Sequence, residues 1–176
     1  MRPLVEPILS DELIQGRIDA LAREMAPTLR DDVIMVTLMT GAFLFGADLA
    51  RALSRAGCTP TLDFMVLSSY GAGTETSGRI TTRLDVRENL SGRQVLLVDD
   101  ILDSGNTLKM ATAHLKNKGA DAILTCVLLD KPARRRVPIQ ADFVGFEIPN
   151  VFVVGFGIDY NQMFRELPYV GHVRTP

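Results

Sequence analysis

The stretch VLLVDDILDSGNTL, residues 95–108, places a glycine-containing polar turn beside three carboxylates. Its apolar start predicts a strand, and the residues after the turn predict a helix. A strand, short turn and helix present unpaired backbone N–H groups at the positive end of the helix dipole, which favours a bound phosphate. Ser104 and Thr107 would add hydroxyl donors, and Gly105 would let the backbone approach the ligand. Because the G-x-x-x-x-G-K-[ST] and G-x-G-x-x-G patterns are missing, the turn predicts a site for one phosphate monoester rather than a polyphosphate.

The carboxylates of Asp99, Asp100 and Asp103 need a partner other than the phosphate. Carboxylate oxygens accept hydrogen bonds, and a ribose offers two adjacent hydroxyl donors. They also bind Mg²⁺, usually through a few oxygens while the substrate supplies the others. The pattern therefore predicts a ribose 5-phosphate, with its diol near Asp99 and Asp100. The alternative is that Asp103 or Ser104 only caps the helix and the other two acids are exposed in a loop.

Length and composition predict one globular domain over residues 1–176, with 47% hydrophobic and 23% charged residues. The net charge of −2 gives no general attraction to nucleic acid or to an anionic membrane. No apolar run reaches the roughly 18 residues of a membrane span, and the N-terminal MRPLVEPILS lacks the form of a secretory signal. Cys58 and Cys126 suggest buried thiols in a reducing compartment, so we expect a cytoplasmic protein.

Hydrophobic periodicity predicts alternating strands and helices. We expect helices over 11–30 (with Ser10 as N-cap), 41–57 and 107–118, and strands over 33–38, 61–69, 95–98, 122–129 and, as the last one, within 151–160. Residues 68–79 predict a loop, and 79–86 the second arm of a hairpin. Continuous apolar strands indicate an α/β fold with a mostly parallel sheet covered by helices on both faces. Ligands of such sheets bind at the carboxyl ends of the strands.

The 95–108 motif resembles the phosphoribosyl-pyrophosphate (PRPP) signature of the type I phosphoribosyltransferases. Nearly the whole chain resembles bacterial hypoxanthine-guanine phosphoribosyltransferases, with MTGAFLFGADL, SSYGAGTETSGRI, LLDKPARRRV and FVVGFGIDYNQMFRELPYVG in the family's order and approximate spacing. The resemblance implies the type I fold with a flexible hairpin hood. It also implies purine salvage, in which the phosphoribosyl group of PRPP passes to N9 of hypoxanthine or guanine, giving IMP or GMP and pyrophosphate. Mg²⁺ as cofactor and a homodimer or homotetramer belong to the same expectation.

The resemblance also implies a role for each matching residue. Asp103 would be the general base at purine N7, while Asp99 and Asp100 would bind the ribose hydroxyls and Mg²⁺. The remaining PRPP contacts would come from Ser104, Gly105, Asn106, Thr107, Thr40, Gly41 and Arg165. The base would be bound by Lys131, Phe152, Val153 and Asp159, with Asp159 near the 2-position or on a second Mg²⁺; Ser69 and Tyr70 would belong to the lid.

Two positions depart from the family pattern, and several alternatives stay open. Relatives often have lysine where this chain has Thr40, next to an unusual cis peptide, and often glutamate where it has Asp99. Without the resemblance, Phe152 would be interpreted as core and Lys131 as a solvated turn residue. Residues 134–136 are interpreted as solvated arginines or a subunit contact. A xanthine-preferring phosphoribosyltransferase and a PRPP-sensing, non-catalytic regulator on the same fold are the alternative functions.

Overall fold

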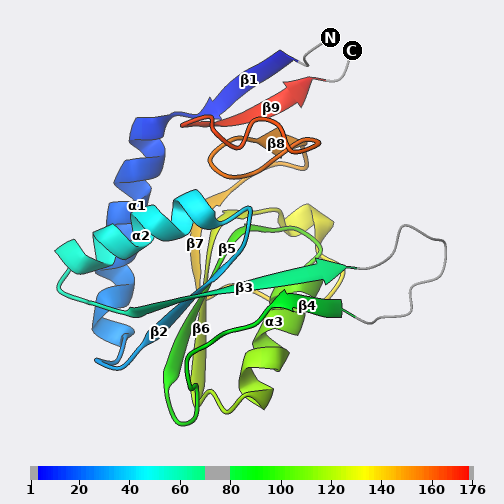
Figure 1. Cartoon of the computed structure of the whole chain (residues 1–176). Helices are drawn as coiled ribbons and strands as arrows, with labels where there is room; N and C mark the ends of the chain where they lie inside the picture. Colours follow the sequence, from blue (N-terminus) through cyan, green and yellow to red (C-terminus); the bar gives the residue numbers. More distant parts are fainter. Residues whose placement is uncertain (1–3, 70–79, 175–176) are drawn as a thin grey trace.

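A six-stranded sheet in the order β4-β3-β2-β5-β6-β7 forms the centre of the computed structural model, which describes residues 4–69 and 80–174 (Figure 1). Its strands are β2 (Ile34–Leu38), β3 (Thr61–Ser69), β4 (Ile80–Leu84), β5 (Gln94–Leu102), β6 (Ala122–Asp130) and β7 (Phe143–Glu147). All neighbours pair in parallel except β4, which runs antiparallel to β3. The predicted α/β fold with a mostly parallel sheet is confirmed.

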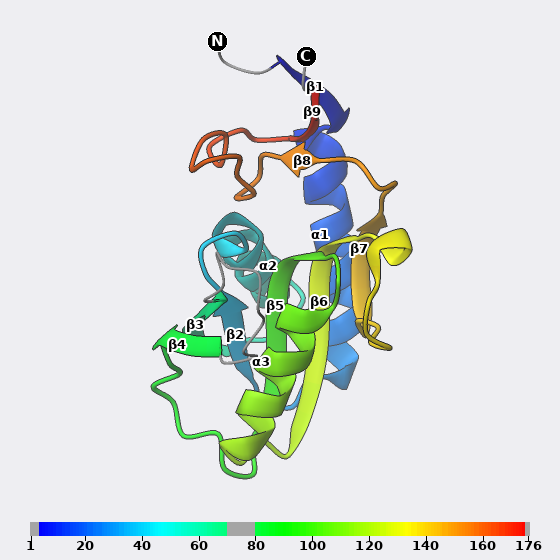
Figure 2. The same cartoon turned by 90° about the vertical axis from the view of Figure 1, so that its right-hand side faces the viewer.

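Helices cover both faces of this sheet. Side chains alternate along each strand, so each strand contributes side chains to both helical layers. The helices α1 (Asp11–Met25) and α2 (Phe43–Arg55) pack on one face, and α3 (Asn106–Asn117) packs on the other (Figure 2). In β5, Leu96 and Val98 join the core of α1 and α2, whereas Val95 and Leu97 join the core of α3. This double burial is why the strand sequence is continuously apolar. No helix of the described residues is long and apolar enough to cross a membrane.

The first helix begins where its sequence predicts and ends earlier. The Ser10 hydroxyl accepts the Leu13 N–H at 3.3 Å, and the residues that α1 buries include Ile14, Ile18 and Met25. The helix does not extend to residue 30 as predicted. It stops at Met25, and a 3₁₀ turn, η1 (Ala26–Thr28), carries Pro27, whose ring cannot continue an α-helix.

A second, three-stranded sheet was not predicted. Its order is β1-β9-β8, formed by β1 (Leu4–Leu9), β8 (Val153–Val154) and β9 (Val170–Arg174), and it lies apart from the central sheet in Figure 1. The prediction of a last strand within 151–160 is wrong, since only two residues there are β and β9 follows them. Gly155 has φ +96°, and a Cβ there would lie 2.0 Å from the Tyr169 carbonyl oxygen, so the chain turns immediately after β8.

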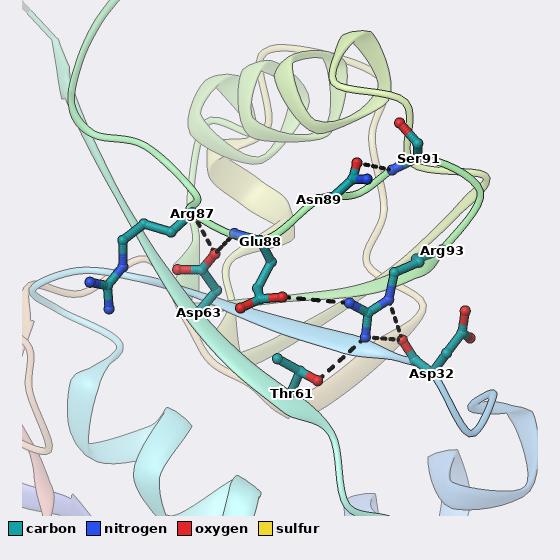
Figure 3. A network of polar contacts seen from close by, with 8 residues as sticks. All are labelled: Asp32, Thr61, Asp63, Arg87, Glu88, Asn89, Ser91 and Arg93. Atoms are coloured by element: carbon teal, nitrogen blue, oxygen red, sulfur yellow. Dashed lines mark hydrogen bonds and ion pairs between the residues drawn. The ribbon is translucent and has the colours of Figure 1, made fainter.

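The hairpin of β3 and β4 is confirmed, with Ser69 paired to Ile80 at its end. Ser69 is the last residue of β3, and Tyr70, the other predicted lid residue, lies outside the described residues. A polar network fixes the segment that returns from β4 to β5 (Figure 3). The buried Asp63 carboxylate accepts the backbone N–H groups of Arg87 and Glu88 at 2.7 and 2.9 Å.

The same polar network also includes Arg93, the residue directly before β5. Arg93 donates to the Asp32 carbonyl oxygen at 2.9 and 2.7 Å and to Thr61 Oγ1 at 3.3 Å (Figure 3). These contacts join the segments before β2, β3 and β5, so the strands that position the candidate site share one anchored end.

Candidate active site

A cavity of about 320 Å³ lies at the carboxyl ends of β2 and β5, where a parallel sheet is expected to bind its ligand. It is lined by Leu38, Met39, Gly41, Leu67, residues 99–105, Thr107, Leu108, Asp159 and Arg165. A neighbouring cavity of about 300 Å³ is lined by Ile101, Asp103, Lys131, Arg134, residues 150–153, Ile158 and Asp159. Ile101, Asp103 and Asp159 line both cavities, so the two hollows meet beside these two carboxylates.

Asp99 and Asp100 are strand residues and not loop acids. Strand β5 runs on to Leu102, four residues beyond the predicted end at Val98, because the backbone continues to pair with β6. Asp99 is only 6% exposed, which rules out the alternative of a solvated acid. Burial raises the pKa of Asp99 well above its usual range, and the adjacent charge of Asp100 raises it further.

The two carboxylates are held by neighbouring backbone groups. The Asp100 N–H donates to Asp99 Oδ1 and the Ile101 N–H donates to Asp100 Oδ1, both at 3.0 Å. Burial raises the pKa of Asp100, while hydrogen bonds with the Asp99 side chain and with the backbone N–H groups of Asp100 and Ile101, and the Arg165 cation, lower it. The cavity therefore contains one buried and one partly buried acid, with Arg165 as a counter-charge to Asp100, an arrangement that favours a ligand bringing hydroxyl donors or a cation.

The turn after β5 leads directly into the N-terminus of α3, beside the first cavity. Gly105, with φ +88°, is the N-cap of α3 and offers no side chain as a cap. The Ser104 hydroxyl accepts the Asn106 N–H at 3.4 Å, which supports the alternative of Ser104 as a helix cap, whereas no such bond links Asp103 to the described part of α3. A Cβ at Gly105 would lie 2.6 Å from Ile139 Cγ2, and glycine is therefore required by space as well as by φ. Ser104, Gly105 and Thr107 line the cavity, whereas Asn106 is exposed and is not among its lining residues.

Gly41 lies directly against the acids. The Met39–Thr40 peptide is cis, and an ideal Cβ on Gly41 would fall 2.0 Å from Asp100 Oδ2. On its other side, a Cβ on Gly157 would fall 2.0 Å from the Gly41 carbonyl oxygen. Thr40 is exposed and does not line the cavity, so the structure brings the Gly41 backbone, and not the Thr40 side chain, to the predicted ligand.

The second cavity brings together the residues predicted to bind a base. Lys131 is buried, and burial lowers its pKa, whereas the Asp103 carboxylate raises it and the Arg134 guanidinium lowers it. Phe152 is 53% exposed, which contradicts its interpretation as core, and its ring meets Tyr160 edge-on at 5.6 Å between centroids. Val153, in β8, lines the same cavity. A donor and an exposed aromatic face therefore lie together, as a flat heterocycle would need.

Asp159 and Arg165 form an ion pair between the two cavities. Arg165 Nη2 lies 2.7 Å from Asp159 Oδ1, and Arg165 Nη1 donates to the Gly157 carbonyl oxygen at 2.7 Å. The Gln162 N–H donates to Asp159 Oδ2 at 2.8 Å. Both oxygens of Asp159 therefore have partners among the described residues.

The carboxylates of this site meet the coordination needs of Mg²⁺ only together with substrate and water. Within residues 4–69 and 80–174, no group of three or more His, Cys, Asp or Glu side chains gathers as a metal site made by protein alone. Mg²⁺ usually takes one or two carboxylates and completes its shell with water and substrate phosphate oxygens. The adjacent acids beside a phosphate-binding turn fit that requirement.

Sequence reasoning missed two arginines, which it interpreted as solvated. Arg134 Nε donates to Asp103 Oδ1 at 2.9 Å. Arg135 Nη1 donates to the carbonyl oxygens of Leu102 and Asp103 at 3.0 and 2.5 Å, and its guanidinium pairs with Asp130. The available signal was topological: this segment follows β6, which lies beside β5, so both strand ends reach the same edge of the sheet.

A mostly parallel sheet with a phosphate-binding turn after two adjacent strand aspartates, and a base-sized cavity beside it, defines a phosphoribosyl-transferring class of α/β enzyme. The family model described as phosphoribosyl transferase domain matches residues 9–161, and the chain belongs to this family. It is 41% identical over 176 residues to hypoxanthine phosphoribosyltransferase of Escherichia coli K12, covering 98% of this chain and 97% of the relative. It is 43% identical over 165 residues to hypoxanthine-guanine phosphoribosyltransferase of Aquifex aeolicus, covering 93% and 91%.

Solved structures agree with this family. A hypoxanthine-guanine phosphoribosyltransferase from Bacillus anthracis superimposes with a TM-score of 0.89 at 36% identity, covering 96% of this chain and 98% of that one. A hypoxanthine phosphoribosyltransferase from Trypanosoma cruzi superimposes with a TM-score of 0.91 at 35% identity, covering 98% and 96%.

Proposed function

We propose that this protein is a purine-salvage enzyme that transfers the phosphoribosyl group of PRPP to N9 of hypoxanthine or guanine, releasing pyrophosphate. The observation that carries the proposal is the meeting of two cavities at Asp103, one lined by the phosphate turn and buried acids, the other by Lys131 and Phe152. A sugar phosphate and a base bound in these cavities would face each other across this carboxylate. The names of the similar enzymes support the same substrates.

The PRPP side follows from the first cavity. The N–H groups at the start of α3, with Ser104 and Thr107, would bind the 5-phosphate, and Asp99 and Asp100 would accept the ribose hydroxyls. The Gly41 backbone and Arg165 would contact the pyrophosphate. Cleavage at C1 of the ribose develops positive charge on the ring, which the fixed carboxylates stabilise. Mg²⁺, held by Asp99 and Asp100 together with substrate oxygens, would neutralise charge on the departing pyrophosphate.

The base side follows from the second cavity. Lys131 would donate to the exocyclic oxygen of a 6-oxopurine, which disfavours the amino group of adenine. Asp103 would take the proton from N7 as the bond to N9 forms, a general-base step worth about 10²–10⁴-fold. Phe152 would stack on the ring, Val153 would offer backbone groups to its edge, and Asp159 would lie near the 2-position.

Assembly, location and partners form a further part of the proposal. We propose that residues 1–176 act as one domain in a cytoplasmic homodimer or homotetramer, without nucleic-acid or membrane partners. The apolar side chains of Leu62, Phe64 and Leu84 are 51%, 41% and 44% exposed on one face of the β3–β4 hairpin, which supports a subunit contact. Cys58 and Cys126 are both free, and Cys126 is buried, in keeping with a reducing compartment.

An ultraviolet assay with PRPP and Mg²⁺ tests the function, with hypoxanthine, guanine, xanthine and adenine offered separately. Turnover of hypoxanthine or guanine but not adenine, lowered in Asp103→Asn, supports the proposal. Turnover of xanthine above both would make the enzyme xanthine-preferring. No turnover of any base, although PRPP protects the protein against heat, would favour a PRPP-sensing regulator.

A further inference from the structure

An ion pair lies along one side of the base cavity. Arg134 Nε donates to Asp103 Oδ1 at 2.9 Å, and both side chains line the cavity that also contains Lys131. Arg134 ends the 3₁₀ turn η2 (Pro132–Arg134), which begins directly after Lys131. This short turn carries the guanidinium back across the end of β5, so one segment supplies two cations to the surroundings of one carboxylate.

Stability does not account for this pair. The Arg134 and Asp103 side chains are 48% and 38% exposed. Ion pairs with this much solvent access contribute little to stability, and many contribute nothing measurable. The main effect of the Arg134–Asp103 ion pair is therefore to fix the position of the Asp103 carboxylate. Within the described part of the chain, the pair leaves Asp103 Oδ2 without a hydrogen bond and available for a proton.

The surroundings of Lys131 indicate why Asp103 is paired with Arg134. Its ammonium makes no hydrogen bond to any residue of the described ranges, although the nearby Asp103 carboxylate acts on it electrostatically. Without Arg134, that carboxylate would be free to pair with the buried Lys131 ammonium, which it already influences electrostatically. A pair between them would occupy both the proton acceptor for N7 and the donor to the 6-oxygen.

We propose that Arg134 is a positioning residue, which holds Asp103 in place through one oxygen and keeps it from pairing with Lys131. This inference rests on the proposed function, because it is there that Asp103 and Lys131 act on the base. Arg134 itself touches no reacting atom. Its effect should therefore pass through Asp103 and disappear when Asp103 can no longer carry a charge.

A double-mutant cycle tests this dependence. Arg134→Ala is expected to lower kcat/KM for hypoxanthine about tenfold, a part of the 10²–10⁴ that a general base supplies, with kcat lowered and KM for hypoxanthine raised. In the Asp103→Asn protein, assayed at raised enzyme concentration, the same change should alter kcat/KM by no more than about twofold, the scatter of non-interacting substitutions. Arg134→Lys, which keeps the charge, should recover part of the loss.

Arg136→Ala is the matched control, because it removes the same side chain two residues along, where it is exposed and makes no side-chain hydrogen bond to a described residue. It should leave kcat, KM for PRPP and the melting temperature unchanged. Equal losses from Arg134→Ala in both backgrounds would overturn the inference, because they would show a role independent of Asp103. If Asp103→Asn impairs the enzyme but Arg134→Ala keeps full activity, the inference about Arg134 is overturned while the proposed function stands. Lack of turnover by the unmodified enzyme with every base would overturn the proposed function as well.

Discussion

Replacing Gly41 by alanine should displace Asp100 and weaken the use of PRPP. The new Cβ would lie 2.0 Å from Asp100 Oδ2 and 2.7 Å from its Cγ, whereas real Cβ contacts are essentially never shorter than 3.0 Å. The carboxylate oxygen or the Gly41 backbone must therefore move by at least the difference, 3.0 − 2.0 = 1.0 Å. The backbone has little room to retreat, since Gly157 packs on the Gly41 carbonyl from the other side.

This displacement sets the expected magnitude. A shift of about 1 Å in a substrate-positioning group can cost on the order of 10²-fold in rate, so kcat/KM for PRPP should fall about 100-fold. Overpacking of a close-packed site should also lower the free energy of unfolding by about 1–3 kcal/mol. Steady-state kinetics with PRPP varied at saturating hypoxanthine gives the first quantity, and urea unfolding gives the second.

Gly16→Ala is the matched control, because a Cβ at this exposed position of α1 would meet nothing within 4 Å. It should leave kcat/KM unchanged and stabilise the helix by about 0.5–1 kcal/mol. A cycle with Asp100→Ala isolates the clash, since this change removes the atoms that the new methyl group would meet. If Gly41→Ala destabilises the Asp100→Ala protein as much as the unmodified one, or leaves kcat/KM for PRPP intact, the reasoning is refuted.

Three further substitutions test base binding, proton transfer and the stability cost of burying Asp99. Lys131→Met should raise KM for hypoxanthine about 10–100-fold, because a hydrogen bond to a charged group is worth about 1.5–3 kcal/mol. KM for PRPP should stay unchanged, and parallel kinetics with adenine should show weaker discrimination between hypoxanthine and adenine. Asp103→Asn should lower kcat about 10²–10⁴-fold with a small change in KM, measured with hypoxanthine under saturating PRPP. Because burial raises the pKa of Asp99 in the folded state, the folded protein binds more protons than the unfolded chain above about pH 4, and stability is lost as the pH rises through the folded-state pKa. Asp99→Asn should therefore be more stable than the unmodified, ligand-free protein at pH 8, and urea unfolding should show this advantage shrinking towards pH 4.

Strand positions were predictable where local pattern and tertiary packing agree. The predicted bounds of β3, Thr61–Ser69, are those observed, and the first helix begins at its predicted Ser10 cap. Continuous apolar strands such as β5 reflect burial on two faces, which a short sequence window can show. β1, β7 and β9 were missed because they are short and partly exposed, without the continuous apolar run that marks β5. β1 also pairs with β9 from the opposite end of the sequence, as when Leu4 pairs with Arg174. Long-range pairing leaves little trace in a local pattern.

The site shows the same division. Residues 99–107 were found because a strand, turn and helix built from neighbouring residues create the phosphate-binding geometry. Arg134 and Arg135 were assigned to the solvent because a run of three arginines in a turn is usually a hydrated surface. Their true environment depends on the order β5-β6 in the sheet, which brings residues 102–104 and 134–137 together. Local chemistry was therefore predictable, whereas the contacts that support it were not.

The two adjacent aspartates are the place where sequence rules and the fold conflict most. In strand β5 two acids follow a continuous apolar run. The fold buries Asp99 and partly buries Asp100, and no cation is paired directly with Asp99 within the described residues. Burying carboxylates without a paired charge is unfavourable, so folding alone would select against this arrangement. A ligand that brings hydroxyl donors and a divalent cation supplies what the free protein lacks, and its binding energy includes relief of that repulsion. The same buried charge that destabilises the free protein therefore increases its preference for a substrate with a diol and a bound metal.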